Sequence, residues 1–376
     1  MRLPLRIVRR IGWGLGVGIS LLGVAEVLGR STLGPPPPAV PLYSVVKPSD
    51  RFLRHEAEVL VPDFQLEPPD ATIPKTTVRP RLVVVGGSSV HFGDARVPPA
   101  REFPQLLETE LGIDVFNLGS PGLDTHDHAR LVDELVEYPW SAILLYAGHN
   151  DFGNAYFLKR YSGARDKSRA VVENLLQHSL VFSLLRRGLT PSAGGGSLRL
   201  SDNRRNAVLS VAQRQDIQAA LLRNVGRMAW ASRRADIPLF VVVPAVGWFS
   251  PPIRGECNEL GCPAKWFRAA ESRRPNAAPG ESARAFRDAG DADGALLHLP
   301  SSTQSALRES RFGGVTVLDA EVGLPREAGV DLPAGSLFVD AVHFSIAGHA
   351  AMADWLEREL RASGRLDLPS ESSVED

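Results

Sequence analysis

The feature of this sequence that most limits its possible folds is an alternation between short apolar segments and segments with helical periodicity. Residues 82–85 read Leu-Val-Val-Val, an apolar, β-branched run of the kind that forms a buried parallel strand. Similar runs return at residues 114–118, 143–146, 238–243 and 315–318, and helical spacing is found over residues 103–111, 219–232 and 346–360. The alternation predicts an α/β fold with a mainly parallel sheet covered on both faces.

The composition is that of a folded globular chain with little charge bias. Of the 376 residues, 44% are hydrophobic and 23% are charged, close to the averages for soluble domains. The formal net charge of -1 leaves no excess of Lys and Arg to neutralise phosphates. We therefore expect no nucleic-acid partner and a substrate that is neutral or weakly charged.

The N-terminal 34 residues depart from this average composition. Apolar residues run from Ile11 to Gly29, broken only by Ser20 and Glu26, and arginines precede the run at positions 2, 6, 9 and 10. The run is long enough to cross a bilayer, and the arginines favour a cytoplasmic N-terminus. We expect residues 1–34 to be an uncleaved membrane anchor, with the remainder on the periplasmic or extracellular side. A cleaved signal segment followed by secretion is the alternative.

The remainder divides into a spacer, a folded body and a tail. Residues 35–80 begin with four prolines and are expected to form a stiff spacer and an extended lead-in. Residues 81–364 form the expected domain, interrupted near residues 154–206, which include a helical pattern at 171–185, and near residues 249–280. Both interruptions follow strands at the edge where open α/β sheets bind ligands, so they form either a lid or surface decoration. The acidic tail, 365–376, is expected to be disordered.

The two cysteines, Cys257 and Cys262, lie close together in the second interruption. An oxidising compartment would allow a local disulfide between them, and two free thiols are the alternative. Without two further clustered ligands they make a poor zinc site, so no metal is expected.

Four polar segments lie at strand exits or helix entrances. Gly86-Gly87-Ser88-Ser89 follows the first strand, and its glycines permit the tight turn that a nucleophilic serine needs. Alone, this segment could equally begin a phosphate-binding turn or a plain loop. The other three segments are Asn117-Leu118-Gly119, Gly148-His149-Asn150-Asp151 and Asp340-Ala341-Val342-His343.

In order and spacing, the four segments together resemble the conserved blocks of the SGNH/GDSL hydrolases, a family of esterases, lipases and carbohydrate deacetylases. The resemblance covers Leu82 to about Leu360 and implies a flavodoxin-like three-layer α/β/α sandwich that needs no cofactor. It makes Ser88 the nucleophile, His343 the base and Asp340 the partner that orients the imidazole. It also implies three oxyanion-hole donors: the backbone N–H groups of Ser88 and Gly119 and the side-chain amide of Asn150.

The chain departs from the family at the motif Gly-Asp-Ser-Leu, which here reads Gly86-Gly87-Ser88-Ser89, with Gly87 in place of the aspartate. A Gly-Gly-Ser sequence at this place is similar to that of membrane-anchored and exported relatives. Ser88 therefore keeps its expected role as nucleophile. Ser89 is the alternative nucleophile.

For several other polar and aromatic side chains, the sequence supports both a functional and a structural interpretation. Asp124, His126, Asp127 and His128 are metal-ligand types, but they lie at an expected helix start, where Asp124 or Thr125 would cap the backbone. His149 either lines the pocket or faces solvent, and Asp151 bonds a neighbouring loop. Trp248 and Phe249 contact either substrate or the protein core.

The expected function is therefore ester hydrolysis, on O-acyl groups of a small molecule or of a cell-envelope carbohydrate or lipid. Two alternatives stay open: transfer of the acyl group to a sugar hydroxyl by the same residues, and an inactive binding module that kept the fold.

Overall fold

The computed structural model describes residues 51–63, 72–91, 97–158 and 208–369, together with a few helical positions between residues 20 and 28. The chain divides into two units, and nearly all the described residues belong to the unit that carries the sheet. Most of the expected membrane segment, and the helix expected over residues 171–185, lie outside the described residues. Within the described part of the chain, no helix has the length and apolar character needed to cross a membrane.

The centre of the sheet-bearing unit is a parallel sheet whose strands come from the predicted apolar runs. The strands are β4 (Arg81–Gly86), β5 (Asp114–Gly119), β6 (Ala142–Tyr146), β7 (Leu239–Val243) and β8 (Val315–Asp319). Their order is β5-β4-β6-β7-β8, and every pair is parallel. The chain turns from β5 back across β4 to β6, so the strand order reverses beside β4, the place where ligands bind in open sheets of this kind. The predicted α/β fold with a mainly parallel sheet is confirmed.

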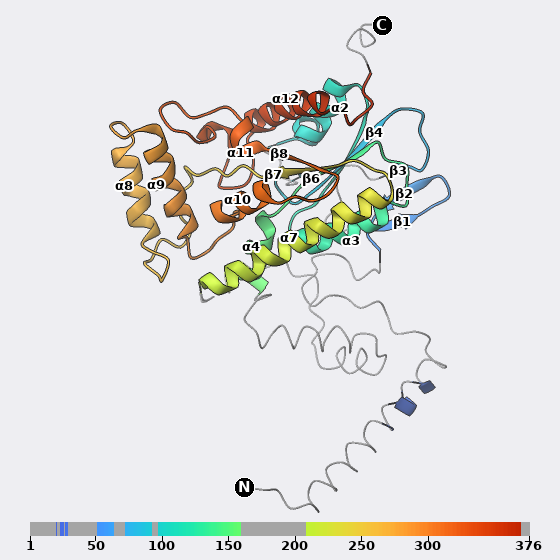
Figure 1. The fold of residues 1–376 in the computed structure, drawn as a ribbon, viewed down its shortest axis with the longest axis horizontal. Helices are drawn as coiled ribbons and strands as arrows, with labels where there is room; N and C mark the ends of the chain where they lie inside the picture. Colours follow the sequence, from blue (N-terminus) through green and yellow to red (C-terminus); the bar gives the residue numbers. More distant parts are fainter. Residues whose placement is uncertain are drawn as a thin grey trace, which may run out of the picture. The chain divides into compact units, whose positions relative to one another are not determined.

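Helices cover both faces of the sheet (Figure 1). α2 (Phe103–Leu111) and α12 (Ile346–Ser363) lie on one face, and α3 (Thr125–Leu135) and α7 (Val211–Arg234) lie on the other. Side chains alternate between the faces along each strand. In β4, Val83 and Val85 pack on the α3 and α7 side, whereas Leu82 and Val84 pack on the α2 and α12 side.

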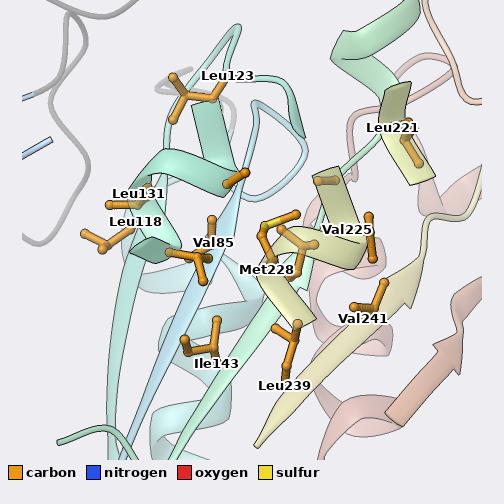
Figure 2. Close-up of a cluster of buried hydrophobic side chains, with 14 of the residues drawn as sticks. Val85, Leu118, Leu123, Leu131, Ile143, Leu221, Val225, Met228, Leu239 and Val241 are labelled. Atoms are coloured by element: carbon orange, nitrogen blue, oxygen red, sulfur yellow. The ribbon is translucent and has the colours of Figure 1, made fainter. Parts of the chain in front are cut away.

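The larger core lies between the sheet and α7 (Figure 2). Val225 and Met228 of α7 lie close to side chains of the central strands, and Leu221, one turn earlier in α7, belongs to the same core. All three are buried, which explains why a 24-residue helix with many charged residues is held on the sheet.

A small antiparallel sheet precedes β4, within the expected lead-in. It consists of β1 (Leu53–His55), β2 (Val59–Pro62) and β3 (Ile73–Pro74). Phe52, Leu60 and Ile73 are buried in the same core as α3, and the Glu134 carboxylate of α3 accepts the backbone N–H groups of Phe52 and Leu53 at 2.8–3.0 Å. The described part of the lead-in is therefore packed on the domain.

The second interruption of the alternation contains one helix that the sequence did not suggest, and another begins at its end. α8 (Pro263–Arg273) packs against α9 (Pro279–Asp291), with Phe267 and Phe286 in a separate small core. Cys257 and Cys262 form a disulfide just before α8. The remaining described elements are α4 (His149–Leu158), α10 (Ser301–Glu309), α11 (Ala320–Gly323) and the short helices η1 (Pro99–Arg101) and η3 (Gly335–Leu337).

The first residues of the expected tail, 365–369, are packed on the domain, and residues 370–376 lie outside the described part of the chain. Leu366 is buried against the α2 and α12 core, and the Arg365 guanidinium donates to Gly314 O at 2.8 Å. Residues 365–369 thus pack on the domain because they bring further apolar surface to that core.

Candidate active site

The turn after β4 places Ser88 at the carboxyl edge of the sheet. The Val90 N–H donates to Gly87 O at 3.0 Å, which closes a tight turn around Ser88 and Ser89. A Cβ atom on Gly86 would lie 2.3 Å from the Val90 side chain and 2.6 Å from Tyr146 O. Only glycine therefore lets the turn approach the neighbouring strand so closely.

Ser88 meets His343 although 255 positions separate them in the chain. His343 Nε2 lies 2.9 Å from Ser88 Oγ, and His343 Nδ1 lies 2.7 Å from Asp340 Oδ2. The second carboxylate oxygen of Asp340 accepts the backbone N–H groups of Val342 and His343, each at 2.9 Å. Asp340 is therefore held by its own turn, just ahead of α12.

The charge of Asp340 determines which ring nitrogen of His343 carries the proton. Burial raises the pKa of Asp340, but the hydrogen bonds and charge of His343, together with the two backbone N–H groups, outweigh this effect and lower it to about 2. An ionised carboxylate can only accept, so Nδ1 must donate to it. In the neutral ring Nε2 then has a lone pair, which accepts the Ser88 hydroxyl proton.

Asn150 lies over the glycine that precedes Ser88. Its Nδ2 donates to Leu123 O at 2.8 Å, and a Cβ atom placed on Gly87 would lie 2.4 Å from the same nitrogen. An amide nitrogen has a second proton to donate. A side chain at residue 87 would therefore require the Asn150 amide, the end of a flexible side chain, to shift from this position.

Gly119 reaches the same edge but its N–H is engaged. It pairs with Gly86 across β5 and β4, and its N–H donates to Asn117 Oδ1 at 2.8 Å. A Cβ atom on Gly119 would lie 2.7 Å from Val90, so this strand end packs directly on the turn after Ser88. The structure thus brings together Ser88, His343 and Asp340 by hydrogen bonds, and gathers Asn150 and Gly119 beside the turn.

A family model described as GDSL-like lipase/acylhydrolase matches residues 82–356, which include the parallel sheet apart from Arg81 and all of these side chains. The chain belongs to this family. As a GDSL-like acylhydrolase it is an ester-hydrolysing enzyme.

Solved structures that match the chain have low sequence identity to it. A lipolytic protein of the G-D-S-L family from Desulfitobacterium hafniense is 12% identical, covers 74% of this chain and 98% of its own, and has a TM-score of 0.37. An acylhydrolase from Bacteroides fragilis is 9% identical, with 75% and 87% covered and a TM-score of 0.40. An acetylxylan esterase from Geobacillus stearothermophilus is 12% identical, with 76% and 96% covered and a TM-score of 0.33. No curated protein sequence matches the chain significantly.

The other histidines near the site of this GDSL-like hydrolase are buried. Burial and the neighbouring His298 and His343 lower the pKa of His149 to about 3, and its Nδ1 accepts the Leu299 N–H at 3.0 Å. Burial and the charge of His343 likewise lower the pKa of His349 to about 4. Both rings are therefore neutral near pH 7 and pack as uncharged groups.

The remaining candidates from the sequence have structural contacts. Asp124 caps α3 by accepting the N–H groups of His126 and Asp127, which confirms the predicted helix start. Trp248 is buried, and its Nε1–H donates to Glu321 at 2.7 Å. Ser89 is also buried, whereas Ser88 is half-buried and bonded to His343. In the described part of the chain, no group of three or more His, Cys, Asp or Glu side chains is arranged as a metal site.

Sequence reasoning missed two buried groups beside the site, His91 and Glu102. The Glu102 carboxylate contacts both His91 and Asn117. His91 lies three residues after Ser88, which hints at proximity, but no spacing relates Glu102 to Asn117.

Proposed function

We propose that this acylhydrolase is a serine esterase in which Ser88 is the nucleophile, His343 the general base and Asp340 the group that orients the imidazole. The observation that carries the proposal is the unbroken hydrogen-bond chain from Ser88 Oγ through His343 to Asp340. It lies at the reversal point of the sheet, where a substrate has access to the ends of β4, β5 and β6.

In the proposed reaction, Ser88 Oγ attacks the ester carbonyl while His343 Nε2 takes its proton. The negative charge that develops on the carbonyl oxygen is stabilised by the Ser88 N–H and by the second proton of the Asn150 amide, whereas the Gly119 N–H already donates to Asn117 Oδ1. His343 then protonates the leaving alcohol and acyl-Ser88 remains. A water molecule, deprotonated by His343, attacks the acyl group and releases Ser88.

The identity of the nucleophile is tested by two single substitutions. We expect Ser88→Ala to abolish hydrolysis of nitrophenyl esters and labelling by a serine-reactive phosphonate, because it removes the attacking oxygen. Ser89→Ala should retain both, since Ser89 is buried beside the turn. Circular dichroism checks that both variants fold. If Ser89→Ala inactivates the enzyme and Ser88→Ala does not, Ser88 is not the nucleophile.

The base is tested by the pH dependence of kcat/KM. His343 accepts the serine proton only when its ring is neutral, so the rate should fall as the pH falls. Asp340 stays ionised throughout such an experiment, because its pKa is about 2. His149 and His349 contribute no limb above about pH 5, because both are neutral there. In Asp340→Asn the maximal kcat/KM should drop, because the amide no longer fixes the proton on His343 Nδ1. An unchanged maximal kcat/KM in this variant would remove Asp340 from the assigned role.

We further propose that the substrate is an O-acyl ester of a cell-envelope carbohydrate or lipid, and that residues 1–34 anchor the enzyme with its domain outside the cytoplasm. The arginine-flanked apolar run supports this location, and so does the disulfide, which persists in oxidising compartments. A reporter that is active only outside the cytoplasm, fused after residue 376, should be active. A signal from a cytoplasmic reporter alone would contradict the location. Supplying glycan hydroxyls with an activated ester separates hydrolysis from acyl transfer, since a transferase would form acylated glycan faster than free acid.

A further inference from the structure

A buried carboxylate lies beneath the two strand ends that form the site. Glu102 precedes α2, and its side chain is only 1% exposed. A carboxylate withdrawn from water this far is retained only when hydrogen-bond donors surround it. The partners of Glu102 therefore indicate what the fold uses it for.

One partner belongs to the turn that carries Ser88. His91 Nδ1 lies 2.8 Å and 3.0 Å from the two carboxylate oxygens of Glu102. The His91 backbone N–H donates to Gly87 O at 3.3 Å, and His91 is 8% exposed. Glu102 thus holds the last residue of the turn whose second residue is Ser88.

The other partner belongs to the end of β5. Asn117 Nδ2 donates to Glu102 Oε2 at 3.1 Å and to Gln105 Oε1 at 3.4 Å, and the residue has no exposed surface. With its amide group oriented in this way, Asn117 presents Oδ1 to the Gly119 N–H at 2.8 Å. The direction of the Gly119 N–H is therefore set by Asn117, and the orientation of Asn117 is set by Glu102.

We propose that Glu102 is a positioning residue, which ties the Ser88 turn to the Gly119 end of β5 so that the Ser88 N–H and the Ser88 hydroxyl keep the geometry that the reaction needs. The inference rests on the proposed esterase function. It requires no contact between Glu102 and substrate, because its effect passes through His91 on one side and Asn117 on the other. Misplacing such donors by about 1 Å can cost about a hundredfold in rate.

The test compares Glu102→Gln with Glu134→Gln. Glutamine keeps the size of Glu102 but removes its negative charge and replaces one accepting oxygen with an NH2 donor, so the charge-assisted hydrogen bonds to His91 and Asn117 are weakened. Glu134 also accepts backbone N–H groups, but it lies near the end of α3 that leads into β6, at the opposite edge of the sheet. We expect Glu102→Gln to lower kcat by about tenfold or more with little change in KM, and to weaken binding of a phenylboronic acid, which forms a tetrahedral adduct on Ser88. Glu134→Gln should retain kcat even where it lowers the melting temperature.

A purely structural role would give a different result. If Glu102→Gln lowers stability but keeps kcat and boronate affinity per folded molecule, the positioning role is wrong. Should this variant fail to fold, His91→Leu removes the hydrogen bond to the Ser88 turn alone and leaves Glu102 bonded to Asn117. This variant should also lower kcat and boronate affinity, and unchanged values would overturn the proposal.

Hydrogen exchange separates failure of this inference from failure of the esterase proposal. The Gly119 amide should be protected in the wild type and exchange faster in Glu102→Gln than in Glu134→Gln, whether or not any ester is hydrolysed. Equal protection in the two variants would contradict the inference. If the wild type hydrolyses no ester but the Gly119 amide still exchanges faster in Glu102→Gln than in Glu134→Gln, only the esterase proposal is contradicted.

Discussion

At the scale of single residues, Gly87 shows how one missing side chain shapes the site. A Cβ atom added at residue 87 would lie 2.4 Å from Asn150 Nδ2, which is too close for both atoms to stay in place. We therefore expect Gly87→Ala to displace the Asn150 amide. Because loss of one oxyanion donor costs about 10²–10³ in kcat, the variant should lose at least about tenfold in kcat with a modest change in KM. Gly153→Ala is the matched control. Gly153 lies in α4, and a Cβ atom added there would lie 3.6 Å from the Leu297 side chain, an ordinary van der Waals distance. Steady-state kinetics on both variants decide the matter, and full activity of Gly87→Ala would show that Asn150 does not act from this position.

At the scale of an element, the start of α3 depends on Asp124. Its carboxylate accepts the N–H groups of His126 at 3.1 Å and Asp127 at 3.4 Å, and also the Asn154 amide at 3.0 Å. Removing an N-cap side chain costs about 0.5–2 kcal/mol, so Asp124→Ala should lower the free energy of unfolding by about that amount. Asp124→Ser keeps a capping oxygen and should recover part of the loss in urea titrations. Equal losses in both variants would assign the effect to the Asn154 contact instead.

At the scale of the whole molecule, the pH dependence of stability should carry a contribution from Asp151. Burial raises its pKa to about 7, although Thr125 donates two hydrogen bonds to the carboxylate. A carboxyl group with a raised pKa in the folded state contributes stability that is present below about pH 4 and is lost as the pH rises to about 7. The Asp151→Asn variant should not show this loss. The difference in unfolding free energy, Asp151→Asn minus wild type, should therefore increase by more than about 1 kcal/mol as the pH rises from about 4 to about 7. Urea titrations at several pH values measure the difference, and parallel curves for the two proteins would refute a raised pKa.

The sequence by itself was enough to predict the layers of the fold. The β-branched runs became the parallel strands, the periodic segments became α2, α7 and α12, and Asp124 caps α3 as its position suggested. These features are local, because periodicity and capping depend on residues a few positions apart. The four polar segments could also be placed at one edge of the sheet, since parallel strands all end on the same side.

Only the tertiary structure decided which of those side chains touch. The contact between Ser88 and His343 depends on the strand order and on the path of the chain between β8 and α12, which no local pattern encodes. The pairing of α8 with α9 and the packing of residues 365–369 follow from apolar surfaces that meet only after folding. Glu102 is the clearest case, because its carboxylate is buried where η1 and α2 meet the ends of β4 and β5, and its two partners are brought there by different elements. Hydrogen bonds between distant segments are set by three-dimensional position, and a sequence read locally does not contain that position.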